Sequence, residues 1–188
     1  MAKAHEKRVD DEAAKINDEE EKDRFYEWAG EDHWRYAKTM PQIFLNSLFV
    51  TIYSVLESEV YKVARRIGTK HKQLFDVSEV RRGDYLESAC YYIERITGIK
   101  AKIFDSWGSL KEGQRLRNVI VHSNGKVIED ADIQLAKKHN VFIESKIEIT
   151  GRPIGEISIT YEFCKSFLDA LRAFFTELYK QTKAGNFV

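Results

Sequence analysis

The chain has 188 residues, of which 43% are hydrophobic, 12% aromatic and 32% charged. This composition excludes a chain that is disordered throughout, a collagen-like chain and a low-complexity chain, because the apolar content is sufficient for a core. The two cysteines, Cys90 and Cys164, lie in unrelated segments, so a disulfide scaffold is excluded as well. The size suits one domain, or one domain with an appended arm.

The formal net charge is zero, but the charges are unevenly distributed. Residues 1–32 contain 12 Asp and Glu against 6 Lys and Arg, a net charge of −6, so residues 33–188 carry +6. A basic body can attract phosphate groups, and an acidic arm would limit its non-specific binding to nucleic acid. The alternative interpretation of the arm is a solvated helical face.

The first half of the chain predicts two helices. Residues 9–38 are rich in Glu, Lys and Ala, which predicts one long polar helix that ends before Pro41. Residues 42–67 carry apolar side chains at spacings of three and four, which predicts an amphipathic helix, central and packed on several sides, with Gly68 as its C-cap. The longest apolar stretch, residues 43–56, is interrupted by polar side chains and is too short to span a bilayer. We therefore expect a soluble, cytoplasmic protein with no membrane partner.

The second half predicts two further helices, a hairpin and a last helix. The helices cover residues 78–96 and about 107–122, and a β-hairpin is indicated at about 141–161, where apolar and polar residues alternate. A final helix covers residues 161–183. The predicted fold class is mainly α, a bundle of about five helices with a β-hairpin inserted before the C-terminal helix. The predicted domains are an acidic helical arm, 1–38, and a helical domain with the hairpin, 39–188.

The usual signatures of metal and cofactor sites are missing from the sequence. It contains no Cys-x-x-Cys, no His-Glu-x-x-His and no glycine-rich phosphate loop, so we predict no metal and no cofactor. Cys90 lies within an apolar helix and is expected to be buried. His5, His33, His71 and His139 are expected to be solvated surface residues. The fourth helix then holds the strongest candidates.

Residues 114–125, which end this helix, place apolar side chains on two faces. On a helical wheel Leu116, Val119 and Ile120 fall together and predict the face that packs on the core. Val121 falls on a different face and would be exposed to water in a monomer. A second copy of the chain packed across that face would cover Val121, so we predict a homodimer.

The polar residues of the same helix could supply phosphoryl chemistry. Arg117 and His122 flank the face opposite the core, and Asn118 is four residues before His122, where it can orient the imidazole. A neutral His can act as general acid or base near pH 7, and an Arg can neutralise a phosphoryl group. With RNA, the 2′-OH serves as nucleophile, and neither a metal nor a protein nucleophile is required. Arg115 and Lys126 are candidates for contacts with the nucleic-acid backbone.

These residues resemble the HEPN superfamily, whose ribonuclease members carry Arg-x4–6-His with a polar residue after the Arg. Arg117-Asn118-x3-His122 fits that pattern, and the likeness covers about residues 40–183. It implies a homodimer with a composite, metal-independent ribonuclease site, RNA as substrate and a role in toxin–antitoxin or phage-defence systems. The same spacing separates Arg66 from His71, but Gly68-Thr69 between them predicts a helix end. Asn124 stands where toxins controlled by a nucleotidyltransferase antitoxin tend to have Tyr.

Two other functions fit the same sequence. The first is a non-catalytic helical dimer that serves as an interaction or nucleic-acid-binding module, with Arg117 an ordinary surface residue and His122 interacting with the helix dipole. The second is a regulatory subunit whose acidic arm, residues 1–32, binds a basic partner. A cognate antitoxin or regulatory protein is therefore a further partner to be expected.

Overall fold

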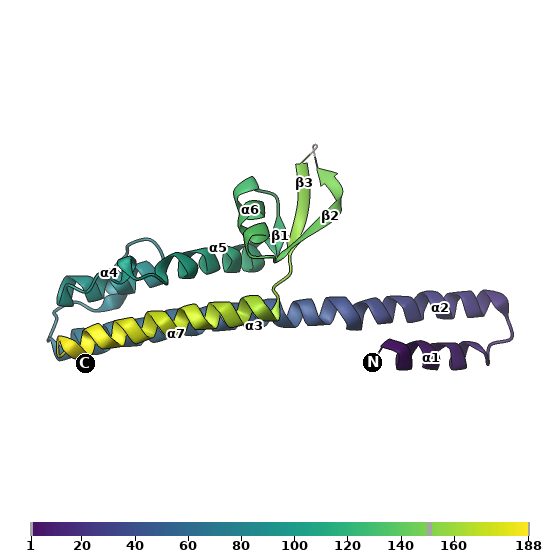
Figure 1. Ribbon diagram of the computed structural model, residues 1–188, viewed down its shortest axis with the longest axis horizontal. Helices are drawn as coiled ribbons and strands as arrows, with labels where there is room; N and C mark the ends of the chain where they lie inside the picture. Colours follow the sequence, from purple (N-terminus) through teal and green to yellow (C-terminus); the bar gives the residue numbers. More distant parts are fainter. Residues whose placement is uncertain (1, 150–151, 188) are drawn as a thin grey trace. The chain divides into compact units, whose positions relative to one another are not determined.

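The computed structural model describes residues 2–149 and 152–187 and divides into two compact units, Met1–Phe44 and Leu45–Val188 (Figure 1). The first unit contains α1 (Ala2–Ala13), α2 (Glu19–Trp34), a π-helical turn η1 (Arg35–Thr39) and the start of α3 (Met40–Lys70). The second unit contains the rest of α3 and every later element.

The second unit is mainly α-helical and includes a small antiparallel sheet. Its elements after α3 are η2 (Val77–Glu79), α4 (Tyr85–Thr97), η3 (Ala101–Ile103), α5 (Trp107–Ser123), β1 (Lys126–Val127), α6 (Asp130–Lys138), β2 (Phe142–Ile149), β3 (Arg152–Ile157) and α7 (Tyr161–Ala184). The strands are ordered β1-β3-β2, and β2 and β3 form a hairpin directly before α7. The predicted fold class is confirmed. The sequence reading missed β1 and α6. The side chains of residues 145–154, on which part of the predicted alternation falls, lie outside the described part of the chain.

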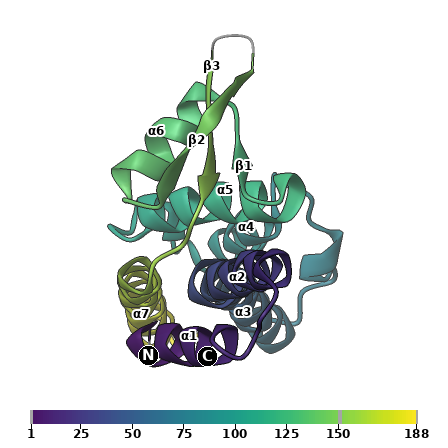
Figure 2. The same cartoon turned by 90° about the vertical axis from the view of Figure 1, so that its right-hand side faces the viewer.

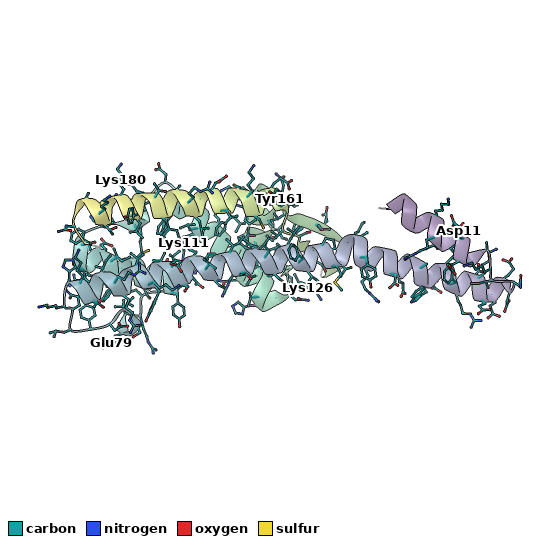
Figure 3. All side chains as sticks on the ribbon, turned by 90° about the horizontal axis from the view of Figure 1, so that it is seen from below. Asp11, Glu79, Lys111, Lys126, Tyr161 and Lys180 are labelled. Carbon is teal, nitrogen blue, oxygen red and sulfur yellow. The ribbon has the colours of Figure 1, made fainter. Side chains whose placement is uncertain are left out.

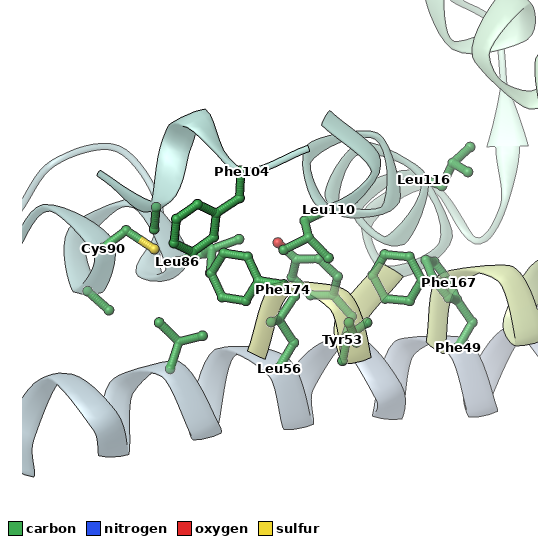
Figure 4. Packing of buried hydrophobic residues seen from close by; sticks show 14 of the residues in the cluster. Phe49, Tyr53, Leu56, Leu86, Cys90, Phe104, Leu110, Leu116, Phe167 and Phe174 are labelled. Carbon is green, nitrogen blue, oxygen red and sulfur yellow. The ribbon is translucent and has the colours of Figure 1, made fainter. Parts of the chain in front are cut away.

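The core of this unit lies between α3 and α7 on one side and α4 and α5 on the other (Figure 2). From Phe49 onward every third or fourth residue of α3 is buried, including Tyr53 and Leu56. The ring of Phe49 packs edge-on against Phe167 at 5.2 Å between centroids, and Tyr53 stacks on Phe167 (Figure 4). Val55 is 51% exposed, so α3 buries one face and is not packed on several sides as predicted.

One side chain ties the sheet to α3. Asn46 donates from Nδ2 to the carbonyl oxygen of Ile157 at 3.2 Å, and its Oδ1 accepts from the backbone N–H of Ile159 at 3.0 Å. The chain leaving β3 is therefore fixed to α3 before α7 begins. Thr160 then caps α7 by accepting from the backbone N–H of Phe163, and the helix follows to Ala184 as the periodicity predicts.

The predicted single polar helix over residues 9–38 is wrong. The chain leaves the helical conformation after Ala13, and Asp18 caps a new helix by accepting from the backbone N–H of Glu20 at 3.1 Å. Asn17 and Asp18 explain the break, because short polar side chains bond to nearby backbone groups and favour caps and turns over helix interiors. Within this unit Tyr26 donates a long hydrogen bond of 3.5 Å to Asp10, which links α2 to α1.

Pro41 does not end a helix as predicted but is the second residue of α3. A proline is tolerated in the first turn because its missing N–H needs no helical partner there. The π-helical turn directly before it, Arg35–Thr39, takes up the local irregularity in the backbone hydrogen bonds. Proline therefore marks a change of helical form at this point.

By length and composition alone, one helical stretch within the described residues, Glu19–Lys70, could cross a membrane. This differs from the expectation that no segment is long and apolar enough. The core helix of a soluble protein meets the same criterion, and part of the stretch, including Phe49, Tyr53 and Leu56, is buried in the second unit. We infer no membrane role from it.

Gly68 is buried inside α3 and is not its C-cap. A Cβ atom at this position would meet the hydroxyl oxygen of Tyr92 well inside van der Waals contact. Tyr92 is fixed there, since its hydroxyl donates to the carbonyl oxygen of Phe75 at 2.9 Å. The helix ends two residues later, and Lys72 adopts the left-handed conformation at φ 49°.

We expect Gly68→Ala to lower the free energy of unfolding by about 1–3 kcal/mol, because the added methyl group displaces a fixed tyrosine. Urea unfolding followed by circular dichroism measures this. Gly108→Ala is the matched control, since nothing lies within 4 Å of a Cβ atom there. The control should be neutral or stabilising by up to about 1 kcal/mol. Equal stability of the two variants would contradict the close packing against Tyr92.

Candidate functional site

The core face of α5, the helix that carries the predicted motif, is the one that the sequence predicts. Leu110 and Leu116 are fully buried, and Val119 and Ile120 pack against the core. The helix ends because Asn124 adopts the left-handed conformation at φ 51°, and the backbone N–H of Gly125 then bonds to the carbonyl oxygen of Val119 at 3.2 Å. The last residues of the motif therefore lie at an exposed helix end.

Arg117 is held against α3, although the sequence predicted it on the face opposite the core. Its Nη1 donates to Oδ1 of Asn118 at 3.0 Å, and its guanidinium carbon lies 6.0 Å from the ring centroid of Tyr53. Its Nε is buried and has no hydrogen-bond partner among the described residues. The Arg117 side chain therefore lies beside Tyr53 of α3 and is only partly exposed to solvent.

His122 is exposed and makes no hydrogen bond or ion pair with any residue that the structure describes. The predicted hydrogen bond to Asn118 is not made, and the Asn118 oxygen accepts from Arg117. Val121, between the two, is 46% exposed, as the wheel predicts. The structure therefore brings Arg117 and Asn118 together and leaves His122 free at the end of the helix.

Two side chains of α3 near Arg117, Glu57 and Tyr53, were not predicted as part of the site. Burial raises the pKa of the Glu57 carboxyl, against the effect of the Arg117 guanidinium, which lowers it. Burial also raises the pKa of Tyr53 far above its usual value, and the nearby Glu57 and Asp84 charges raise it further. The Tyr53 hydroxyl is buried without a hydrogen-bond partner in the described chain, and its ring points from α3 toward α5 (Figure 4).

An ion-pair network fixes the start of α4 against α5. Lys111 lies 2.6 Å from Asp84 and 2.9 Å from Glu87, and Asp84 caps α4 by accepting from the backbone N–H of Glu87. Burial would raise the pKa of Asp84, but the hydrogen bonds from Lys111 and Glu87 hold it below its usual value. The helix predicted from residue 78 therefore begins at Tyr85. The sequence signal for this start is the Asp-x-x-Glu pattern of residues 84–87, which is typical of the N-terminus of a helix.

Of the two residues predicted to contact a nucleic-acid backbone, one is already paired. Arg115 forms an ion pair with Asp132 of α6 and lies 4.0 Å from Glu129. Lys126 is exposed in β1, toward the opposite end of the second unit from Glu79 (Figure 3). Arg115 is therefore engaged with α6, and the contact of either residue with a nucleic-acid backbone stays a prediction.

The remaining histidines and the cysteines lie away from the motif. His139, predicted to be solvated, instead pairs with Oε2 of Glu112 at 2.8 Å. The side chains of His5 and His33 lie outside the described part of the chain. Cys90 is buried as expected, and burial raises the pKa of its thiol to about 12. Among the described residues, no three His, Cys, Asp or Glu side chains are grouped as metal ligands.

Comparison of the chain with models of protein families, with curated proteins and with solved structures found no match. The likeness to the HEPN superfamily therefore stays a hypothesis that rests on the residues of α5. Chemically, the site offers a guanidinium beside the Tyr53 ring and near the Glu57 carboxylate, and an exposed imidazole.

Proposed function

We propose that the chain is a metal-independent endoribonuclease of HEPN type. The observation that supports this function is the arrangement on α5, where Arg117 is anchored by Asn118 and Tyr53 while His122 is exposed one turn further on. An anchored guanidinium can stabilise a fixed negative charge, and a free imidazole can transfer protons near neutral pH.

In the proposed reaction the 2′-OH of RNA attacks the adjacent phosphorus. His122 acts as general base or acid, and Arg117 stabilises the extra negative charge of the pentacovalent transition state. The 5′-oxygen of the next nucleotide leaves with a proton, and the product keeps a 2′,3′-cyclic phosphate. DNA is not cleaved because it lacks the 2′-OH. A cytoplasmic role in phage defence or in a toxin–antitoxin system, with an antitoxin or regulatory protein as partner, belongs to this proposal.

The proposed site is composite and needs a second copy of the chain. Within one chain Arg117 bonds to Asn118 and not to His122, and in the proposed site one phosphate would be held by residues from both protomers. The exposed Val121 between them gives the apolar surface that the partner would cover.

The proposal is tested by incubating total RNA with the full chain in excess EDTA. We expect cleavage products with 2′,3′-cyclic phosphate ends and no cleavage of single-stranded DNA. Products with other ends, or a requirement for a divalent metal, would contradict the mechanism. No cleavage of any RNA would favour the interaction module described below.

We expect Val121→Glu to convert the proposed dimer to a monomer and to lower cleavage at least about tenfold, because a charge would be buried at the apolar contact. Light scattering after size exclusion measures the mass. Leu168→Glu is the matched control, since Leu168 of α7 is also 46% exposed. A dimer that survives Val121→Glu would show that α5 does not form the interface.

A second candidate function, a non-catalytic interaction module with the same fold, is favoured by one observation. The Nε of Arg117 is buried and its Nη1 is engaged by Asn118, so part of the guanidinium is committed to the protein itself. In such a module the arginine would be structural. His122→Ala would then change no measurable property, while Val121→Glu would still disrupt assembly.

A further inference from the structure

A cleft of about 750 Å³ in the described part of the second unit lies outside the motif. It is formed by α3, η2 and the beginning of α4. The buried side chains of Val77 and Ala89 give it an apolar floor. This size and lining are typical of sites that hold a small molecule or a single flat ring system.

One of the two carboxylates in this cleft has no hydrogen-bond or ion-pair partner among the described residues. Two carboxylates line the cleft, Asp84 and Glu57, but Asp84 is engaged by Lys111 and by the backbone of α4. Glu57 makes no hydrogen bond or ion pair among the described residues, although Arg117 is close enough to lower its pKa. The cleft therefore offers a half-buried pair of acceptor oxygens to a ligand that brings its own donors.

Aromatic side chains stand at the rim and the wall of the same cleft. Tyr85, the first residue of α4, is 73% exposed, and Tyr61 of α3 lines the wall with its hydroxyl bonded to Asp76 at 3.3 Å. An exposed aromatic ring above an apolar floor is the arrangement on which unstacked nucleobases pack.

Basic residues predominate on one side of the cleft, although Glu57 and Asp84 line the cleft itself. Residues 62–82 contain seven Lys and Arg against two Asp and Glu, and Arg81 lines the cleft itself. A second hollow of about 440 Å³ on the last turns of α3 is lined by Lys62, Arg65, Arg66, Thr69 and Lys70. Glu79 marks this end of the unit in Figure 3. Basic side chains beside a base-sized cleft attract a phosphate backbone and repel a cationic peptide.

We infer that this cleft binds one unstacked guanine of a single-stranded RNA, with Glu57 accepting hydrogen bonds from its Watson–Crick edge and Tyr85 stacking on the ring. Guanine fits best because its N1–H and exocyclic amine are adjacent donors that match the two oxygens of a carboxylate. Arg81 and the basic turns of α3 would contact the flanking phosphates. The inference deepens the proposed function, on which it rests for RNA as the ligand.

The test measures binding separately from cleavage. Fluorescence anisotropy compares labelled five-nucleotide RNAs, all uridine or with one central guanosine, adenosine or cytidine, in the His122→Ala full-length chain. We expect the guanosine oligomer to bind about tenfold more tightly than the others, a difference of about 1.4 kcal/mol. Adding Glu57→Gln should abolish that preference. Adding Glu59→Gln, an exposed carboxylate paired with Lys62 on the same helix, should keep it.

Urea unfolding would show whether Glu57→Gln disturbs the fold. If it does, two further variants test the inference. Tyr85→Leu should weaken binding of the guanosine oligomer, and Arg81→Ala should weaken all four oligomers alike. Equal affinity for all four, or a preference that survives Glu57→Gln, would overturn the inference. So would Glu57-dependent binding of a lysine-rich peptide without RNA binding.

The failure of this inference and of the proposed function can be told apart. A wild-type chain that prefers guanosine through Glu57 but never cleaves RNA would keep the base site and reject the ribonuclease. A chain that cleaves RNA at every base equally, with no effect of Glu57→Gln on affinity, would reject the base site alone.

Discussion

Replacing His122 with Ala is expected to lower the rate of RNA cleavage about 100- to 10,000-fold, the range that general acid–base catalysis contributes. The folded state should not be affected, because His122 is exposed and has no hydrogen bond or ion pair among the described residues. We expect its free energy of unfolding to change by no more than about 0.5 kcal/mol. Single-turnover cleavage of a labelled RNA, with urea unfolding in parallel, measures both quantities.

The matched control for this variant is His71→Ala. Arg66 and His71 have the same spacing as Arg117 and His122, but α3 ends at Lys70, so His71 lies beyond the helix and its ring packs 5.4 Å from that of Phe187. His71→Ala should therefore leave cleavage within about twofold of the wild type. If His122→Ala were as active as this control, the imidazole would have no part in the reaction, and the non-catalytic module would be the better account.

The sequence predicted correctly those elements whose signals are local. The end of α5 at Asn124, the hairpin before α7 and the length of α7 each follow from periodicity and from residues that favour left-handed or turn conformations. The core face of α5 was predicted for the same reason, since 100° per residue assigns Leu116 to it without knowledge of the neighbours.

What could not be predicted depends on contacts between distant segments. Gly68 looks like a helix terminator until Tyr92, from another helix, is known to lie against it. Likewise, α5 taken alone places Arg117 opposite the core, but in the structure Arg117 lies near Tyr53 and Glu57 of α3. The cleft beside Glu57 had no sequence signal at all, because its wall combines α3, η2 and α4.

The second large expected effect is that of replacing Arg117, which lies near Tyr53 and Glu57 of α3. Arg117→Ala should lower cleavage about 100- to 1,000-fold, the usual cost of removing one group that stabilises a developing negative charge. It should also lower the free energy of unfolding by about 1–3 kcal/mol, because Glu57 then loses a nearby positive charge and Tyr53 loses a packed neighbour. Cleavage kinetics and urea unfolding of the same preparation measure the two effects.

Arg117→Lys separates the structural part of this loss from the catalytic part. The lysine keeps the positive charge beside Glu57 but cannot present a planar, bidentate fork to a phosphate or stack on Tyr53. Stability should therefore be largely restored while cleavage stays at least about tenfold low. Arg172→Ala, which changes an exposed arginine of α7, is the control and should alter neither quantity. If Arg117→Lys restored stability and activity together, the guanidinium would act only as a buried counter-charge to Glu57, and the phosphate contact would have to come from another residue.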